Sequence, residues 1–159
     1  MSKPIYFELD NLDHDQEIAI TLGNLVVAWS SAEIMLGVCM THVFNVEVNM
    51  GLNSFFLIPT FESRTKFLRM AIVGWENPKK LDKEKLDRII EKYTKLSLQR
   101  NSWIHNSWCK HHLTNRTVVV STKKIADRVK IVNANSIAQH NKAVNEQTSL
   151  LSEMFPGHR

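Results

Sequence analysis

The sequence predicts an all-α fold: a four-helix up-and-down bundle with a short irregular or β-hairpin insertion between the third and fourth helices. Apolar residues recur at intervals of three and four along several long segments, which is the spacing of one helical face. Only 5 Gly and 4 Pro occur in 159 residues, too few for a turn-dense sandwich or barrel. The length is that of one domain, so residues 1–159 are expected to bury these faces in a single bundle.

The first helix is expected to run from a cap at Asp13 to Phe44. Residues 1–12 precede it as an extended arm, either a short strand or a packed tail. Residues 45–58 are expected to be an irregular connection. The apolar face of this helix is predicted to consist of Ile18, Leu22, Leu25, Val26, Trp29, Leu36 and Met40.

A second helix is expected from about Thr60 to a point before Asn77-Pro78, because the residue before a proline is pushed out of the helical region. Its predicted apolar residues are Phe61, Phe67, Leu68, Ala71 and Ile72. A third helix begins near Asp82. Its apolar stripe is Leu86, Ile89, Ile90, Tyr93 and Leu96, and the same stripe continues to Arg100, Trp103 and Ile104.

Residues 106–134 form the predicted insertion. Within it, residues 117–120 and 129–132 are short and β-branched, which predicts two strands of a hairpin. Ser136, with Gln139 three residues later, is the expected cap of the last helix.

The charge and the terminal sequence set expectations for partners and location. The net charge of +4 suits an anionic partner, and is equally typical of a mildly basic soluble protein. Cys39 and Cys109 form no disulfide framework. The N-terminus lacks the apolar core of a signal peptide, and we see no apolar run near the ~20 residues of a membrane span. We expect a cytoplasmic protein with no membrane partner.

The residues at the end of the predicted third helix are the strongest candidates for a functional site. The apolar stripe directs Arg100 inward, where a guanidinium needs a carboxylate or a cleft. Asn101 and His105 are four residues apart and share a face. Arg100 and His105 lie about 140° apart on an ideal helix, so they converge only if the helix ends or bends, or if a second chain contributes.

The segment Arg100-Asn101-Ser102-Trp103-Ile104-His105 resembles the signature of the HEPN superfamily: arginine, a polar residue, three spacers and histidine. The place of this segment, near the end of the third of four helices, resembles that superfamily too. The resemblance implies a metal-independent ribonuclease that needs no cofactor and acts as a homodimer. It also suggests a toxin or phage-defence effector, with an antitoxin protein as a further partner.

The resemblance gives each of the three residues a role. His105 would handle protons, Arg100 would hold the scissile phosphate, and Asn101 would orient either group. Histidine titrates near neutrality and arginine presents a fixed fork of donors, which fits cleavage of RNA by its own 2′-hydroxyl. The alternatives are a non-catalytic HEPN-like module that binds RNA or protein, and a structural helix end in which Arg100 forms an internal salt bridge.

Residues after the signature are candidates for RNA contact. Trp108 is placed to stack on a base, and Lys110, His111 and Arg116 to touch phosphates. His105, Cys109, His111 and His112 also suggest a metal cluster, but structural zinc needs four ligands in defined pairs, and no second pair is evident. We therefore expect no metal.

Two features of the first helix complete the prediction. Glu33 lies on the apolar stripe and needs a partner, either Arg64 or Arg100. A structural ion pair is the favoured interpretation, and support of Arg100 at the site is the alternative. Gly23, Ser30 and Gly37 recur every seven residues, which indicates close packing within the chain or, alternatively, a dimer contact.

Overall fold

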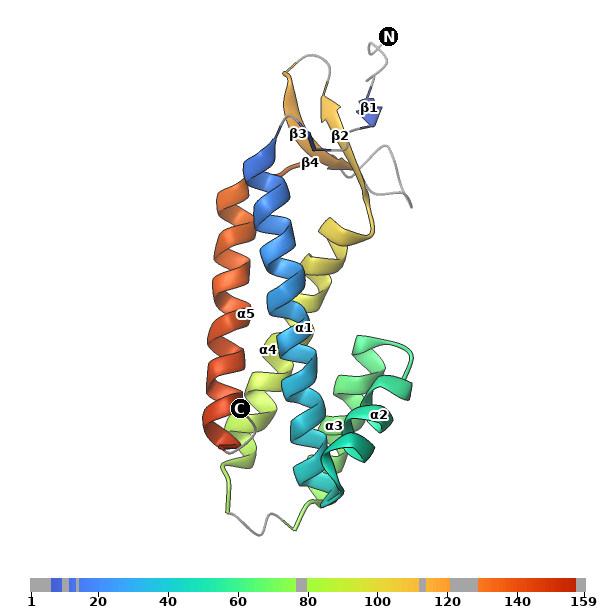
Figure 1. Cartoon of the computed structure of the whole chain (residues 1–159), viewed down its shortest axis with the longest axis vertical. Helices are drawn as coiled ribbons and strands as arrows, with labels where there is room; N and C mark the ends of the chain where they lie inside the picture. The colour runs from blue at the N-terminus through green and yellow to red at the C-terminus, as the bar shows by residue number, and fades with distance from the viewer. Residues whose placement is uncertain are drawn as a thin grey trace. The chain divides into compact units, whose positions relative to one another are not determined.

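The structure is a computed structural model that describes residues 7–9, 12–13, 15–76, 80–111, 114–120 and 129–156. Within these ranges the chain is mainly helical with a small antiparallel sheet (Figure 1). The helices are α1 (Gln16–Phe44), α2 (Val48–Leu57), α3 (Phe61–Gly74), α4 (Lys83–Ile104) and α5 (Ala134–Met154). The strands are β1 (Phe7–Leu9), β2 (Ser107–His111), β3 (Arg116–Val120) and β4 (Val129–Ile131).

Contacts within the chain divide it into two compact units. The sheet unit comprises Met1–Val26 and Leu98–Asn141, and the helical unit comprises Val27–Ser97 together with Lys142–Arg159. Three helices, α1, α4 and α5, contribute residues to both units.

The sheet has the strand order β1-β2-β3-β4, and all its neighbours are antiparallel. The predicted hairpin of residues 117–120 and 129–132 is confirmed as β3 and β4, with Val118 opposite Ile131. The sequence analysis missed β2, which pairs with β3 on one side and with β1, from the N-terminal arm, on the other. Cys109, Val118 and Val120 form a buried apolar cluster on the sheet.

The helices α1, α3 and α5 each begin after a residue whose side chain accepts a hydrogen bond from an N–H of the first turn. Two of the predicted capping residues are wrong. Asp15, rather than Asp13, accepts a bond from the Ile18 N–H at 3.3 Å. Asn133, rather than Ser136, accepts from the Ser136 N–H at 2.8 Å. The physical reason is position, because a cap must stand directly before the first helical residue. The expected start of α3 at Thr60 is confirmed, since its hydroxyl accepts from the Ser63 N–H.

The core of the helical unit is centred on Trp29 of α1. Its ring lies 4.9 Å from that of Phe61 and 6.4 Å from that of Tyr93 in α4. The Tyr93 hydroxyl is hydrogen-bonded to Thr148 of α5 at 2.8 Å, so one aromatic cluster joins α1, α3, α4 and α5. Burial of Tyr93 raises the pKa of its phenol. Of the predicted apolar positions, Val26 and Phe67 are wrong, because both are exposed.

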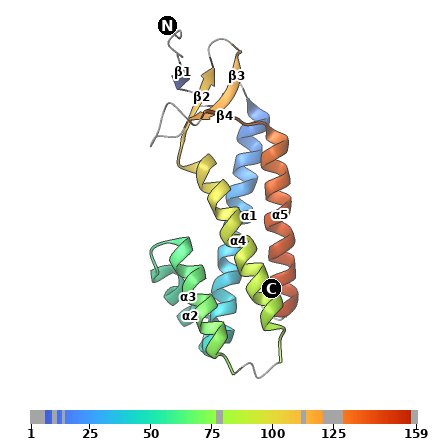
Figure 2. The ribbon, with the colours of Figure 1, turned by 180° about the vertical axis from the view of Figure 1, so that it is seen from behind.

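Residues 45–58 are not irregular as expected, because they contain α2. Glu47 caps this helix by accepting from the Met50 N–H at 3.2 Å. Its close approach to α1 depends on glycine: a Cβ at Gly51 would lie 2.2 Å from the Thr41 Cγ2 and 3.0 Å from the Thr41 Cα. Figures 1 and 2 both show α2 and α3 side by side.

The packing of α2 on α1 also explains one of the small residues that recur along α1. A Cβ at Gly37 would lie 2.6 Å from the Leu52 Cδ2, so Gly37 serves packing within the chain. Gly23 has nothing within 4 Å of the corresponding position.

Substitution of Gly51 by alanine is expected to destabilise the protein by about 1–3 kcal/mol, the usual cost of overpacking. The clash involves backbone of Thr41, which a rotamer change cannot relieve. Urea unfolding followed by circular dichroism measures the change. Asn53→Ala, an exposed position on the same helix, is the control and should change stability by less than about 0.5 kcal/mol. Equal stability of the two variants would contradict the packing described here.

Candidate functional site

The last turn of α4 carries two of the three signature residues. Arg100 is half-buried, and its Nη1 donates to the Asn101 Oδ1 at 3.0 Å. Asn101 is exposed, so its amide holds the guanidinium at the rim of the helix end. The hydrogen bond limits the orientations open to the Arg100 guanidinium.

His105 is the first residue after α4, and its side chain is exposed. Its backbone N–H still donates to the Asn101 carbonyl at 3.1 Å, which ties it to the last helical turn. Because the helix ends before His105, the 140° separation on an ideal helix does not fix the direction of the imidazole. Convergence of the Arg100 and His105 side chains stays a prediction.

Trp103 anchors the helix end between the two signature positions. Its side chain is 3% exposed, and its ring lies 5.0 Å from the ring of His140 in α5, edge to face. Its carbonyl accepts a 2.8 Å bond from the Trp108 Nε1. Trp103 is thus a core residue, as expected. Trp108 is half-buried and bonded through its indole, so it offers only part of its ring to a base.

The sequence analysis did not single out His140. This histidine is buried in the sheet unit beside Trp103. A signal was available, because His140 stands three residues after Ile137 and four before Val144, both on the buried face of α5.

The other predicted RNA-binding residues lie on the hairpin of β2 and β3. Lys110 is opposite Thr117, and His111 is opposite Arg116, which is exposed. The His111 Nδ1 is hydrogen-bonded to the Thr114 hydroxyl at 3.0 Å in the turn. His112 lies outside the described residues.

Positive charge is concentrated along this part of the chain. Residues 98–141 contain seven Lys or Arg and a single acidic residue, Asp127, whereas the whole chain has a net charge of only +4. The segment that follows Arg100 is therefore the most basic part of the molecule, which favours contact with a polyanion.

Glu33 belongs to the helical unit, and its partner is Arg64. The Arg64 Nη1 donates to the Glu33 Oε1 at 2.9 Å, and the Arg64 Nε donates to the Ile58 carbonyl at 2.8 Å. The Arg64 guanidinium also lies 5.4 Å from the Phe55 ring centre. This arrangement is the expected structural ion pair, formed with Arg64 and not with Arg100.

Within the described ranges, no group of three or more His, Cys, Asp or Glu side chains is placed to hold a metal ion. Cys39 and Cys109 are buried and do not form a disulfide, and burial raises the pKa of the Cys39 thiol. A thiol with a raised pKa is a poor metal ligand and a poor nucleophile at neutral pH.

The α1 helix is more apolar than the sequence analysis allowed. By length and composition Gln16–Phe44 qualifies to cross a membrane, with a mean hydropathy of 1.5 over 18 residues, and 28% of that window is buried. A mostly buried core helix of a soluble protein and a signal sequence near the N-terminus meet the same criterion.

Comparison with known proteins assigns the chain to no family. Scans of family models, curated proteins and solved structures found no match to the chain. The site itself consists of a guanidinium hydrogen-bonded to an amide, an exposed histidine five residues later, and a basic hairpin.

Proposed function

We propose that the protein is a metal-independent endoribonuclease of the HEPN type. The observation that carries the proposal is the end of α4, where Arg100 donates to Asn101 and His105 is exposed directly after the helix. An active centre for phosphodiester cleavage needs a fixed cation and an accessible proton carrier. These two groups stand at one helix terminus, and a basic segment follows them.

In the proposed reaction, the RNA 2′-hydroxyl attacks the adjacent phosphorus and the 5′-oxygen leaves. His105 takes the proton of the hydroxyl or returns one to the leaving oxygen. Arg100 binds the non-bridging oxygens, and these charge-assisted bonds strengthen as negative charge builds in the transition state. Asn101 keeps the guanidinium oriented. The products are a 2′,3′-cyclic phosphate and a 5′-hydroxyl.

The proposal includes a homodimer, because the reaction uses both an acid and a base and each chain supplies one signature histidine. The outer face of α1 is the candidate contact. Residues 18–32 contain no charged side chain, and Ile20, Val27 and Ile34 are 64%, 68% and 49% exposed at intervals of seven residues. Two copies of a +4 protein meet with least electrostatic repulsion on an uncharged face.

We also propose that the fold is a HEPN-like four-helix bundle. Its four helices would be α1, α3, α4 and α5, and α2 and the sheet would be additions to the bundle. The proposal places the protein in the cytoplasm as a toxin or phage-defence effector whose activity an antitoxin would neutralise. The alternative function is a HEPN-like module that binds RNA or protein without cleaving it.

Cleavage of single-stranded RNA in excess EDTA tests the proposal. The wild-type protein is expected to cut the RNA and to leave 2′,3′-cyclic phosphate ends, which mass spectrometry identifies. The matched substrate carries a single 2′-deoxy residue at the preferred site. It should resist cleavage at that bond alone, because the attacking hydroxyl is missing.

Three outcomes count against the proposal. Inhibition by EDTA would indicate a metal enzyme, and cutting at the 2′-deoxy position would exclude attack by the 2′-hydroxyl. Binding of the RNA without cleavage would favour the non-catalytic module. Sedimentation of the same sample measures whether the chain is dimeric.

A further inference from the structure

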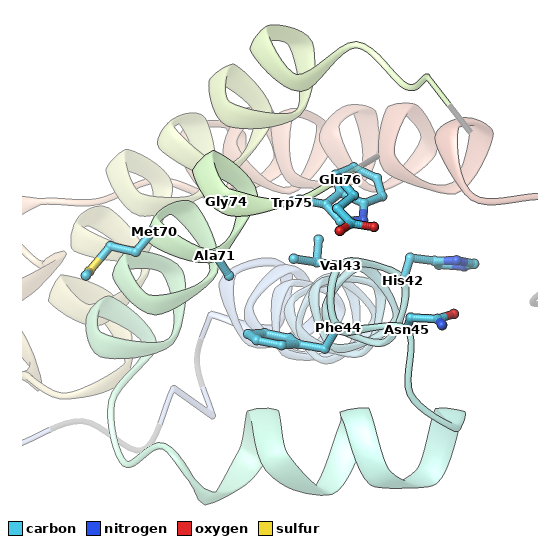
Figure 3. A pocket seen from close by; sticks show the side chains of 9 residues that line it. All are labelled: His42, Val43, Phe44, Asn45, Met70, Ala71, Gly74, Trp75 and Glu76. Carbon is cyan, nitrogen blue, oxygen red and sulfur yellow. The ribbon is translucent and has the colours of Figure 1, made fainter. Parts of the chain in front are cut away.

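The helical unit has a pocket of about 600 Å³ where α1 and α3 end (Figure 3). This volume is in the range of small-molecule sites. The pocket lies entirely within one unit and contains none of the signature residues. Its lining residues are His42, Val43, Phe44, Asn45, Met70, Ala71, Gly74, Trp75 and Glu76.

The lining is divided by polarity. Figure 3 shows Phe44, Met70 and Ala71 toward one side of the pocket, and His42 and Asn45 toward the other. The side chains of Trp75 and Glu76 overlap in the same view and are drawn above Val43. The His42 ring is stacked on Phe155 at 4.7 Å, which fixes part of the polar side. A ligand that fits this lining has an apolar body and one polar head.

The charged residues near the pocket indicate whether the polar head of the ligand is positive or negative. Glu76 is the one acidic residue among the described lining residues, and none of them is a lysine or arginine. The helices α1 and α3 both end at this pocket, at Phe44 and Gly74, and the carbonyl end of a helix carries partial negative charge. The Lys83 ammonium donates to the Trp75 carbonyl and does not line the pocket. Glu76 is therefore the one formally charged side chain among the described lining residues, and the Lys83 ammonium is already bound to the Trp75 carbonyl.

We propose that this pocket binds a small organic amine, with its ammonium group at Glu76 and its aromatic or aliphatic body against Phe44, Val43 and Met70. The ammonium gains a charge-assisted hydrogen bond from the carboxylate. The apolar body covers part of the exposed Phe44 and Met70 side chains, which are 42% and 68% exposed. This site is independent of the proposed cleavage of RNA.

Titration with two probes that differ only in the polar head tests the proposal. Phenethylamine and 2-phenylethanol share one carbon skeleton, so the comparison isolates the positive charge. The full chain is titrated with each while amide chemical shifts are recorded by NMR. Phenethylamine is expected to bind about tenfold more tightly than the alcohol, because only the amine forms a charge-assisted hydrogen bond with the Glu76 carboxylate. The shifts should be centred on Phe44, Ala71 and Gly74.

Two variants assign the effect to the carboxylate. Glu76→Gln is expected to reduce amine binding to the level of the alcohol. Glu62→Gln removes an exposed carboxylate from the start of the same α3 helix, outside this pocket, and should leave the tenfold ratio unchanged. The proposal is overturned if amine and alcohol bind equally, if the two variants behave alike, or if neither probe shifts the pocket amides.

Discussion

Replacement of His105 by alanine is expected to lower the rate of RNA cleavage by about 100- to 10,000-fold, the usual contribution of a general acid or base. His105 is the exposed histidine directly after α4 and the one imidazole of the signature. The rate is measured under single-turnover conditions in EDTA. Because the side chain is exposed, the free energy of unfolding should change by less than about 0.5 kcal/mol.

Arginine variants on the same helix separate the site from the general basic charge. Arg100→Ala should also lose most of the activity, because it removes the group that binds the phosphate. Arg88→Ala is the matched control: Arg88 is 65% exposed on α4 and lies 3.6 Å from Glu84. It removes the same charge and should retain cleavage. Full activity of His105→Ala, or equal losses for both arginine variants, would refute the assignment of the site.

Replacement of Trp29 by alanine is expected to destabilise the helical unit by about 3–5 kcal/mol, as for other buried tryptophans. Trp29 is 2% exposed and packs on Phe61 and Tyr93, so its loss leaves a cavity where α1, α3 and α4 meet. Chemical denaturation followed by circular dichroism measures the change.

Ser31→Ala is the control for this substitution. Ser31 is exposed two residues further along α1, and its hydroxyl donates to the Val27 carbonyl of its own helix. Its loss should change stability by less than about 0.5 kcal/mol. A Trp29 variant as stable as the Ser31 variant would show that the aromatic cluster does not hold the unit together.

Several elements were predictable because the information that specifies them is local. The long helices α4 and α5 repeat their apolar residues over many turns, so the period is clear. The α1 helix was predictable from its length of apolar sequence, although it also exposes apolar residues such as Val26. Two short runs of β-branched residues predict the hairpin of β3 and β4. The position of Arg100, Asn101 and His105 at the end of α4 follows from the same helical register.

Other elements depend on partners distant in sequence. The α2 helix has only ten residues, and its contact with α1 relies on the missing side chain of Gly51, which no periodicity reveals. Short helices are marginal alone and gain their stability from such packing. The mixed sequence of β2 becomes a strand through pairing with β1 and β3.

The sequence by itself determined at which helix end Arg100, Asn101 and His105 stand. Only the tertiary structure decided which side chains distant in sequence become partners. Glu33 and Arg64 are 31 residues apart, and Tyr93 and Thr148 are 55 apart. The two-sided pocket arises where the ends of α1 and α3 meet. A helix period is a property of neighbouring residues, whereas an ion pair, an aromatic cluster or a pocket exists only after separate segments have packed together.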